Sequence, residues 1–535
     1  MFTARLILTI GFLAAALGGY SQDSLLLRDY QFVRRSDAWL TSHNAAGLTR
    51  LATPGISEAE LSLTKGNGGL TDYDGSANTL DFSARIASYT RLSRRTVVFG
   101  SMAYNNYSGK DMAGSAFISS DRKPFGLVED SLTNTGTKHR DTYQLAGGVG
   151  IDVVKGLAVG LRFDYTAANY AKYKDLRHKN KLMDMTFTAG LLTPVAPWLS
   201  LGANYLYRRN TESVAFSLYG REDKVYKTLI DYGAFMGRVE QFGSTGFTDK
   251  SREMPLVDDY NGGGLQFSLQ PAEGVTFYSA ITYTYRKGYY GRKSPYTITY
   301  TNHHSNLLSY EARLSWQTPQ TALHADLTLS SENLENEANT YRERQNDAGA
   351  YYYEYYDPVK TANKLWKDGR LLLTADLGIQ GELPRWTLTA GLNWMHRQQT
   401  AYLYPYYRRQ DLRQTEVAAS ATRNWPTAKG VWTLSLAAAY QKGSGQPCED
   451  LTFAAPSSKQ SAPASMEAWL MREYQYLVAP QYSIGGALKY AFVMPKTRLK
   501  THVRLSLSHR KANNSYAYSN GSDHTQATIA IGCTF

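Results

Sequence analysis

TIAIGCTF, residues Thr528 to Phe535, is the stretch that decides the fold. Ile529, Ile531 and Cys533 share one apolar face, and the Thr, Gly and Ala residues between them form a second face of small side chains. Side chains alternate in this way along a β-strand. A strand at the end of a chain needs a partner for its backbone groups. The sequence therefore predicts a terminal strand, containing Ile529, Ile531 and Phe535, that closes a sheet.

The same alternation recurs along the chain, most clearly over residues 157–166, 386–394 and 498–507. These segments run to about 10–14 residues, whereas strands usually have about 5–6. Their polar faces repeatedly carry full charges. The pattern predicts that Leu161, Phe163, Leu392, Trp394, Leu505 and Ile531 point outward and that Arg162, Asp164, Asn393 and Arg504 point inward.

The connections between these segments alternate between short and long. Short turns are expected at residues 93–95, 155–156, 194–197, 271–274, 383–385, 427–430 and 495–497. Long connections are expected at residues 107–138, 219–258, 333–366 and 443–470, with smaller ones near 170–179, 290–302, 403–410 and 512–523. Short turns on one side and long loops on the other are typical of a transmembrane antiparallel β-barrel. We therefore predict an all-β fold with about 18 strands, with 16 as the alternative, because bacterial barrels have even strand numbers.

The N-terminal region differs from the rest of the chain. Residues 1–22 combine a basic residue, a short apolar core and small residues, which is the pattern of a secretory signal peptide. Residues 23–55 do not alternate, and residues 56–535 carry the strand pattern. We predict a signal peptide over 1–22, a lumenal plug-like segment over 23–55 and a transmembrane barrel over 56–535, exported to the outer membrane of a Gram-negative bacterium.

Composition limits the classes of function. The net charge is +12, but acidic residues lie beside the basic ones, which favours contact with outer membrane lipids over binding of nucleic acid. The two cysteines, Cys448 and Cys533, predict neither a disulfide framework nor a metal site. The sequence has no HExxH motif and no phosphate-binding Gly-rich loop before a helix. Neither a metal nor another cofactor is predicted.

Two patterns in the sequence are similar to parts of catalytic sites, but neither predicts a complete site. His303 and Ser305 have the spacing that puts both on one strand face, as in a barrel phospholipase, and Asp258 with Asp259 is similar to an acidic pair of barrel proteases. The first pair is expected at a loop edge, and no third group that would orient it can be identified. We predict no enzymatic activity.

SDAWLTSHNAAGLTRL, Ser36 to Leu51, resembles the N-terminal stretch of the FadL-like family of hydrophobic-compound channels. The matching residues are Ser36, Asp37, Ala38, Asn44, Ala46, Gly47 and Leu48, whereas Ala45 stands where the family has Pro. The resemblance implies a plug inside the lumen, with Asp37, Asn44 and Gly47 as plug residues. The whole chain also resembles uncharacterised outer-membrane barrels of Bacteroidetes that are known only as a domain of unknown function.

Charged residues repeat on the predicted inner faces. The candidates for lumen-facing charges are Arg162, Asp164, Arg498, Lys500, His502 and Arg504. One interpretation is that such charges neutralise one another across neighbouring strands and against the plug. The other is a cationic path for an anionic solute, because charged rings select what passes a pore.

Tyrosines cluster in AYYYEYYDP, residues 350–358, and in AYLYPYYRR, residues 401–409. We expect an interfacial girdle at the headgroup layer, with a surface that stacks sugars or contacts a protein partner as the alternative.

These features favour a channel or transporter for a small or amphipathic solute. The alternative is a membrane subunit whose long loops dock a surface lipoprotein, a TonB-dependent receptor or a secretion apparatus. The state of the lumen discriminates between transport and docking. An open path past residues 23–55 favours transport, and a filled lumen favours docking. An unfilled barrel of about 18 strands would leave an aqueous channel, so we expect the plug to limit solute passage.

Overall fold

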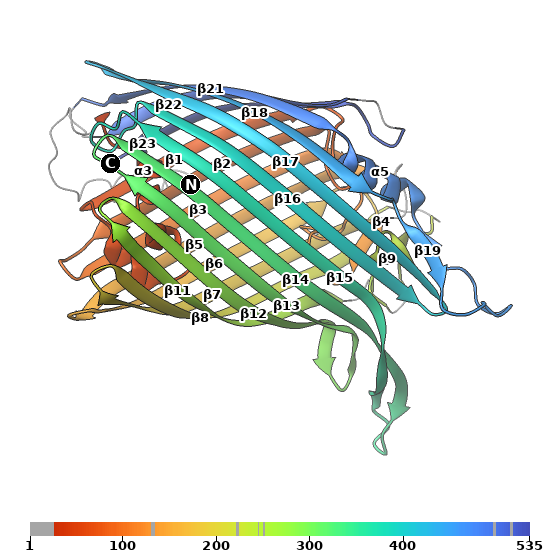
Figure 1. Ribbon diagram of the computed structural model, residues 1–535. Helices are drawn as coiled ribbons and strands as arrows, with labels where there is room; N and C mark the ends of the chain where they lie inside the picture. The colour runs from red at the N-terminus through yellow and green to blue at the C-terminus, as the bar shows by residue number, and fades with distance from the viewer. Residues whose placement is uncertain are drawn as a thin grey trace.

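The computed structural model describes residues 26–129, 134–220, 224–243, 246–249, 252–495, 499–513 and 517–535. The predicted signal peptide lies outside these residues. Within them, 18 antiparallel strands form a closed ring (Figure 1). The strands are β1 Gly55–Asn67, β2 Asn78–Arg91, β3 Thr96–Met112, β5 Gly136–Val154, β6 Leu157–Lys172, β7 Arg177–Ala196, β8 Leu199–Ser217, β11 Met254–Ala272, β12 Val275–Ser294, β13 Thr297–Gln317, β14 Thr321–Gln345, β15 Tyr351–Leu377, β16 Trp386–Leu403, β17 Tyr406–Thr427, β18 Gly430–Gly445, β21 Gln481–Val493, β22 Lys500–Ala512 and β23 Asp523–Thr534.

The terminal strand closes the ring. β23 pairs with β1 over the register that runs from Glu58 opposite Thr534 to Asn67 opposite Thr525. The backbones of Ser57 and Phe535 exchange two further hydrogen bonds, of 2.8 and 3.1 Å. Closure removes both free edges of the sheet. The predicted barrel and its 18 strands are confirmed, and the alternative of 16 strands is wrong.

The connections define two different ends of the barrel. The short-turn end holds residues 92–95, 155–156, 197–198, 273–274, 318–320, 378–385, 428–429, 494–495 and 499 between strands. The opposite loop end holds the long connections and lies at the right of Figure 1. The other predicted short turns fall at the first end, the predicted turn at 495–497 lies mostly outside the described residues, and the turn at 318–320 was missed.

Three predicted loops are wrong. Residues 403–410 belong to β16 and β17 except for Tyr404 and Pro405. Residues 333–366 belong to β14 and β15, which pair as far as Gln345 opposite Tyr351. Residues 290–302 belong to β12 and β13, which pair as far as Ser294 opposite Thr297. In Figure 1 the β14–β15 ribbon bends away from the barrel beyond the loop end. Residues 333–366 and 290–302 are polar. A polar sequence indicates contact with water and not an irregular backbone, because the two strands of a ribbon satisfy each other's backbone hydrogen bonds.

The outer face is apolar along the middle of the strands. Leu161, Phe163, Leu505 and Ile531 are exposed on it, at 49%, 45%, 54% and 51% of their surface. Such a surface is compatible with the hydrocarbon layer of a membrane, where lipid covers it. In the described part of the chain, no helix is long and apolar enough to cross a membrane.

A plug formed by the N-terminal segment lies in the lumen at the short-turn end. It contains the helices α3 Tyr30–Arg35 and α4 Ala38–Thr41 and the 3-10 helix η2 Ala45–Arg50. Its apolar side packs on inward wall residues. The shared cluster includes Tyr30, Val33, Leu40, Leu48, Tyr89 and Val97.

A cap formed by loop segments lies against the inner wall at the loop end. Its sheet has the order β20–β10–β9–β4, with bounds Ala464–Ser465, Met236–Gln241, Lys227–Gly233 and Gly126–Glu129. The helix α5, Glu467–Val478, contacts β17 and β18, and β9 contacts β15, β16 and β17. β19, Glu449–Thr452, pairs with β17 at the rim. The sequence did not predict this cap.

Candidate functional site: a lumenal chamber between plug and cap

Asn44 is the central polar anchor of the plug. The residue is fully buried, and its amide nitrogen donates to the carbonyls of Leu191 at 2.8 Å and Ala203 at 3.3 Å and to Gln266 Oε1 at 3.0 Å. Its side-chain oxygen accepts from the Ala46 backbone at 3.1 Å. These contacts fix the start of η2 against β7, β8 and β11. Buried amides left without such partners would cost stability.

Glycines in the wall form the seat of η2. A Cβ at Gly160 on β6 would lie 2.0 Å from the Ala46 nitrogen, and one at Gly190 on β7 would lie 2.0 Å from Asn44 Oδ1. Within the plug, a Cβ at Gly47 would lie 2.6 Å from the Trp39 carbonyl oxygen. A larger residue at Gly160 or Gly190 would force the plug and the wall apart, and one at Gly47 would disturb the packing of η2 on α4 within the plug.

Ion pairs hold the other side of the plug. Arg28 Nε lies 2.9 Å from Glu382 Oε2, and Arg35 lies 3.0 Å from the buried carboxylate of Asp376 on β15. Asp37 caps α4, because its carboxylate accepts from the Trp39 backbone at 2.9 Å. Of the three proposed plug residues, Asn44 contacts the wall directly, while Asp37 and Gly47 shape the plug itself.

Basic side chains on the inner wall hold the cap. Lys138 on β5 donates to the carbonyls of Ala113 at 3.1 Å and Ser115 at 2.9 Å. Arg397 on β16 donates to both carboxylate oxygens of Glu473 on α5, at 2.9 and 2.6 Å. Similar contacts join Lys172 to Glu129, Arg286 to the Arg122 carbonyl, Lys364 to the Lys123 carbonyl and Arg408 to the Ala234 carbonyl. Many inward cations therefore bind the cap.

The predicted lumen charges are largely paired as well. Arg162 makes two hydrogen bonds of 2.8 Å with Asp164 on the same strand. His502 and Arg504 both contact Glu60, at 3.2 and 2.9 Å. Lys500 donates to the Arg28 carbonyl of the plug at 2.6 Å. Arg498 lies outside the described residues.

The candidate catalytic residues lie in a buried network under the cap. His303 is in the middle of β13, so its predicted place at a loop edge is wrong, and Asp258 contacts its Nε2. Asp258 also accepts from Arg286 at 2.8 and 3.0 Å. The Ser305 hydroxyl donates to Glu332 at 2.8 Å. The five side chains are buried, and the network fixes the cap to β11, β12, β13 and β14.

Asp259 does not join Asp258, because neighbouring residues of a strand face opposite sides of the sheet. The Asp259 carboxylate accepts from Tyr207 at 2.9 Å and lies 3.5 Å from Arg209. The two acids therefore do not form a pair that could act together.

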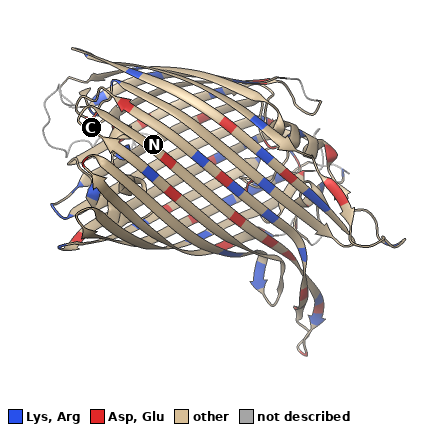
Figure 2. Ribbon diagram, viewed as in Figure 1, with Lys and Arg blue, Asp and Glu red and all other residues tan. Residues whose placement is uncertain are grey.

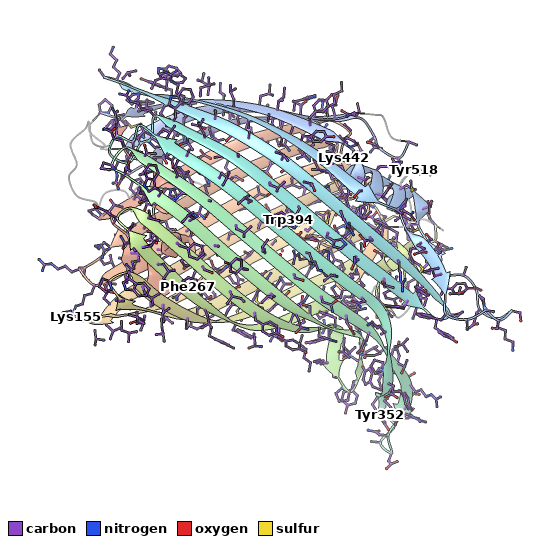
Figure 3. The ribbon with its side chains drawn as sticks, in the orientation of Figure 1. Lys155, Phe267, Tyr352, Trp394, Lys442 and Tyr518 are labelled. Carbon is purple, nitrogen blue, oxygen red and sulfur yellow. The ribbon has the colours of Figure 1, made fainter. Side chains whose placement is uncertain are left out.

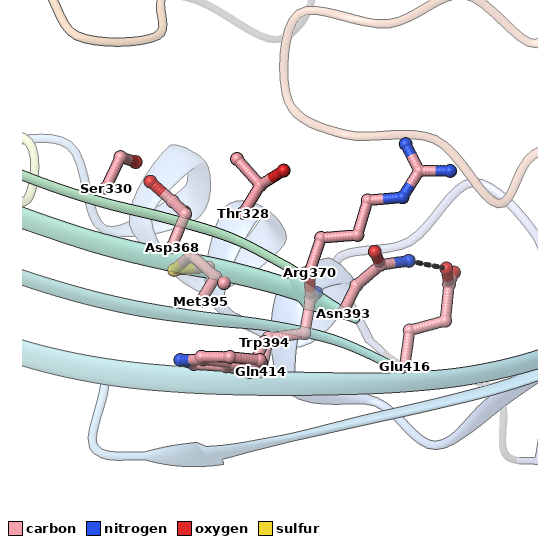
Figure 4. Close-up of a pocket in the computed structure, with 10 residues that line it drawn as sticks. Thr328, Ser330, Asp368, Arg370, Asn393, Trp394, Met395, Gln414 and Glu416 are labelled. Atoms are coloured by element: carbon pink, nitrogen blue, oxygen red, sulfur yellow. Dashed lines mark hydrogen bonds between the residues drawn. The ribbon is translucent and has the colours of Figure 1, made fainter. Parts of the chain in front are cut away.

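A polar pocket of about 300 Å³ lies between plug and cap (Figure 4). Its position follows from β15, on whose inner face Asp368 binds Arg122 of the cap and Asp376 binds Arg35 of the plug. The pocket is lined mainly by Thr328, Ser330, Asp368, Arg370, Asn393 and Glu416. We call it the chamber pocket.

Arg370 is the unpaired charge of the chamber pocket. Figure 4 shows its side chain extending from the wall, with the guanidinium at the tip. Among the described residues, no ion pair or hydrogen bond of this guanidinium is found. Asn393 donates to Glu416 at 2.9 Å. The pocket therefore offers one free cation, an acidic group and several hydroxyl and amide groups to a polar solute. In the described part of the chain, no His, Cys, Asp or Glu side chains gather in a group that could hold a metal ion.

Acidic residues in the cap have shifted pKa values. Burial raises the pKa of Asp72 and Asp74, in the β1–β2 loop, and of Asp231 on β9. Their mutual repulsion and that of Glu473 raise the pKa of Asp72 further. The folded cap thus binds more protons than the unfolded chain does, so its stability falls as pH rises above the ordinary value of 3.8.

Comparison with known proteins gives a family but no activity. Residues 45–535 match the model of a family of unknown function, DUF6850. The chain belongs to this family. No curated protein matches it.

Solved structures share the general barrel with this DUF6850 chain. The ferric preacinetobactin receptor BauA from Acinetobacter baumannii has 8% identity and a TM-score of 0.41, with 90% of this chain and 80% of that chain covered. The outer membrane transporter YddB from Escherichia coli has 9% identity and a TM-score of 0.39, with 89% and 81% covered. At these values the similarity carries no argument about function.

The sequence analysis did not identify three residues of the chamber pocket: Asp368, Arg370 and Glu416. The signal was present, because strand alternation puts Asp368 and Arg370 on the same face of β15 as Asp376. The match to DUF6850 includes only the end of the Ser36–Leu51 stretch, and its FadL-like resemblance stays a prediction.

Proposed function

We propose that this protein is an outer-membrane barrel that moves a small polar or amphipathic solute through a gated lumen. The observation that carries the proposal is the chamber pocket, with its unpaired Arg370, between two separate closures. A scaffold needs neither such a chamber nor a lumenal cation that has no ion-pair partner among the described residues. The apolar outer face supports insertion in a membrane.

Because the plug and the cap both lie in the lumen, we propose a gated passage and not a permanently open pore. Solute entering from the loop end would meet the cap, reach the chamber and then meet the plug. The chamber groups would hold the solute between the two steps.

Chemical labelling tests whether the chamber is reached during opening. The native cysteines Cys448 and Cys533 are first replaced by Ser, and Arg370→Cys is introduced. In liposomes, a membrane-impermeant methanethiosulfonate reagent should label position 370 slowly. The matched control is Val417→Cys, which faces lipid and should stay unlabelled.

Labelling at position 370 only after denaturation would count against transport, because the chamber would then be sealed. Equal labelling of both positions would mean that the strand register is misplaced. Faster labelling when the plug is destabilised would support passage through the plug end.

The second candidate function is docking of another outer-membrane protein or a lipoprotein, and the β14–β15 ribbon favours it. Tyr351, Tyr355 and Tyr356 are exposed on this ribbon, and exposed tyrosines are common in protein interfaces. Deletion of residues 340–358 should then remove a partner that copurifies with the intact protein. If the partner set is the same after deletion, the ribbon is not a docking surface.

A further inference from the structure

Three rows of outward residues cross β15 to β18 on the outer wall. The first row, Leu371, Leu392, Val417 and Tyr440, belongs to the apolar belt. The next row toward the loop end is Gly369, Trp394, Thr415 and Lys442. The third row is Lys367, His396, Arg413 and Ser444. Figure 3 labels Trp394 on the front wall, with Lys442 nearer the loop end.

Trp394 marks the edge of the apolar belt. Its ring lies over Gly369, where an added Cβ would come within 1.8 Å of it. Tryptophan is enriched at the boundary between hydrocarbon and headgroups. The basic residues of the second and third rows therefore stand at the level of the headgroups. Figure 2 shows charged residues concentrated toward this end of the barrel wall.

These basic residues have too few acidic partners. The Arg413 side chain is 68% exposed and lies 3.8 Å from Asp411, which is already bound by His396 at 3.0 Å. Lys367 and Lys442 are exposed, and within the described residues neither forms an ion pair. We call Lys367, His396, Arg413 and Lys442 the basic quadrant.

Elsewhere on the outer wall, several cations are paired with carboxylates. The three pairs that show this are Arg209 with Asp259 at 3.5 Å, Lys360 with Glu335 at 3.0 Å and Lys181 with Glu253 at 3.0 Å. At the basic quadrant, by contrast, Lys367 and Lys442 form no ion pair among the described residues, and Arg413 shares its one carboxylate with His396, which gives a local surplus of positive charge.

A groove adjoins the basic quadrant. β18 leaves β17 after Gly445, whose φ of +126° turns the chain away, and β17 then pairs with β19 from Arg409 onward. The gap forms a groove of about 680 Å³. Its outer lining includes Gln398, Thr400 and Ser444, whose amide and hydroxyl groups suit sugar hydroxyls.

We propose that the basic quadrant and its groove bind the phosphorylated sugar headgroup of an outer-leaflet glycolipid. The acyl chains would lie on the apolar belt below Trp394, the phosphate against Lys367, Arg413 and Lys442, and the sugar in the groove. Basic clusters at the membrane surface recognise anionic headgroups in this way. The inference rests on the proposed insertion in the outer membrane but not on transport.

Native mass spectrometry of the full protein in detergent tests the site. The probes are diphosphorylated lipid A and dephosphorylated lipid A. The site variant is Lys367→Gln/Arg413→Gln/Lys442→Gln, and the control is Lys181→Gln/Lys287→Gln/Lys360→Gln, which removes the same charge from other parts of the wall. The site variant should bind diphosphorylated lipid A roughly 100-fold more weakly, at about 1 kcal/mol per basic residue, and the control should bind like the unmodified protein.

Equal losses in the two variants would overturn the proposal, because the attraction would then be general. Equal binding of the two lipids by the unmodified protein would also overturn it. Competition by inorganic phosphate at concentrations equal to those of the lipid would indicate a site for a soluble anion instead. Heat-modifiable migration on gels shows whether each variant is folded. Glycolipid binding is measured in detergent and does not depend on solute passage. A negative binding result is therefore distinguishable from a negative result of chamber labelling.

Discussion

Gly160→Ala should push the plug off its seat. The added methyl group would lie 2.0 Å from the Ala46 nitrogen and 2.2 Å from the Ala45 carbonyl carbon. Both neighbours are backbone atoms of η2, so no side-chain rotation can relieve the overlap. The wall strand is held on both sides by β5 and β7, and the plug is therefore the part that moves.

The size of the effect follows from the contacts of Asn44. To reach a tolerable contact distance of about 3.2 Å, η2 must move by about 1.2 Å. A closely packed interior does not accommodate a shift of this size without a loss of stability. The bond from Asn44 to the Leu191 carbonyl, now 2.8 Å, would lengthen to about 4 Å, and the bond to Gln266 would break with it. Two buried groups without partners cost about 1–3 kcal/mol each. The open population of the plug should rise by at least about 30-fold.

Hydrogen–deuterium exchange measures that opening directly. Backbone amides of residues 44–51 should exchange faster in the variant, while the amides of β6 keep their protection. Gly147→Ala on β5 is the matched control, because a Cβ there meets nothing within 4 Å. Unchanged exchange over 44–51 in a folded Gly160→Ala protein would refute the close contact between η2 and the wall.

Three further outcomes follow from the same structure. Ile529→Asp and Ile531→Asp should impair barrel assembly, because a charge on the lipid face costs up to about 2–4 kcal/mol at the membrane centre; normal amounts of heat-modifiable barrel would count against this. Fluorophores at 161 and 163 should be quenched by lipid-soluble quenchers and those at 162 and 164 should not, whereas the reverse pattern would overturn the register. Amide exchange in the cap, corrected for intrinsic rates, should increase as pH rises through the raised pKa values of Asp72 and Asp74; Asp72→Asn should weaken this dependence, and an unchanged profile would show that these carboxyls do not control the cap.

The barrel was predictable because alternation is a local property. The pattern of Leu161, Arg162 and Phe163 needs only the neighbouring residues to be interpreted, and the ending at Phe535 pointed to closure. The strand count followed from the turns, even though residues 290–302 were misassigned. Residues 341–351, at the tip of the β14–β15 ribbon, look like a loop because their side chains are exposed on both faces.

The cap and the chamber pocket were not predictable in the same way. Arg286 and Asp258 are 28 residues apart, and the contact of Arg122 with Asp368 spans 246 residues. Nothing local in the sequence says that the loop with Arg122 folds inward rather than outward. Lys138 and Lys364 lie on the inner wall, and only the folded loops reveal the carbonyls that they bind.

The central claim is that two independent closures in series enclose the chamber, and single-channel conductance tests it most directly. Three deletion variants are compared in planar bilayers: one without residues 26–52, one without the cap segments 114–129 and 224–252, and one without both. Because each closure blocks a different end, either single deletion should leave conductance low, and the double deletion should give the conductance of an open aqueous barrel. A folded double deletion that stays closed, or a plug deletion that alone opens the full channel, would contradict the account.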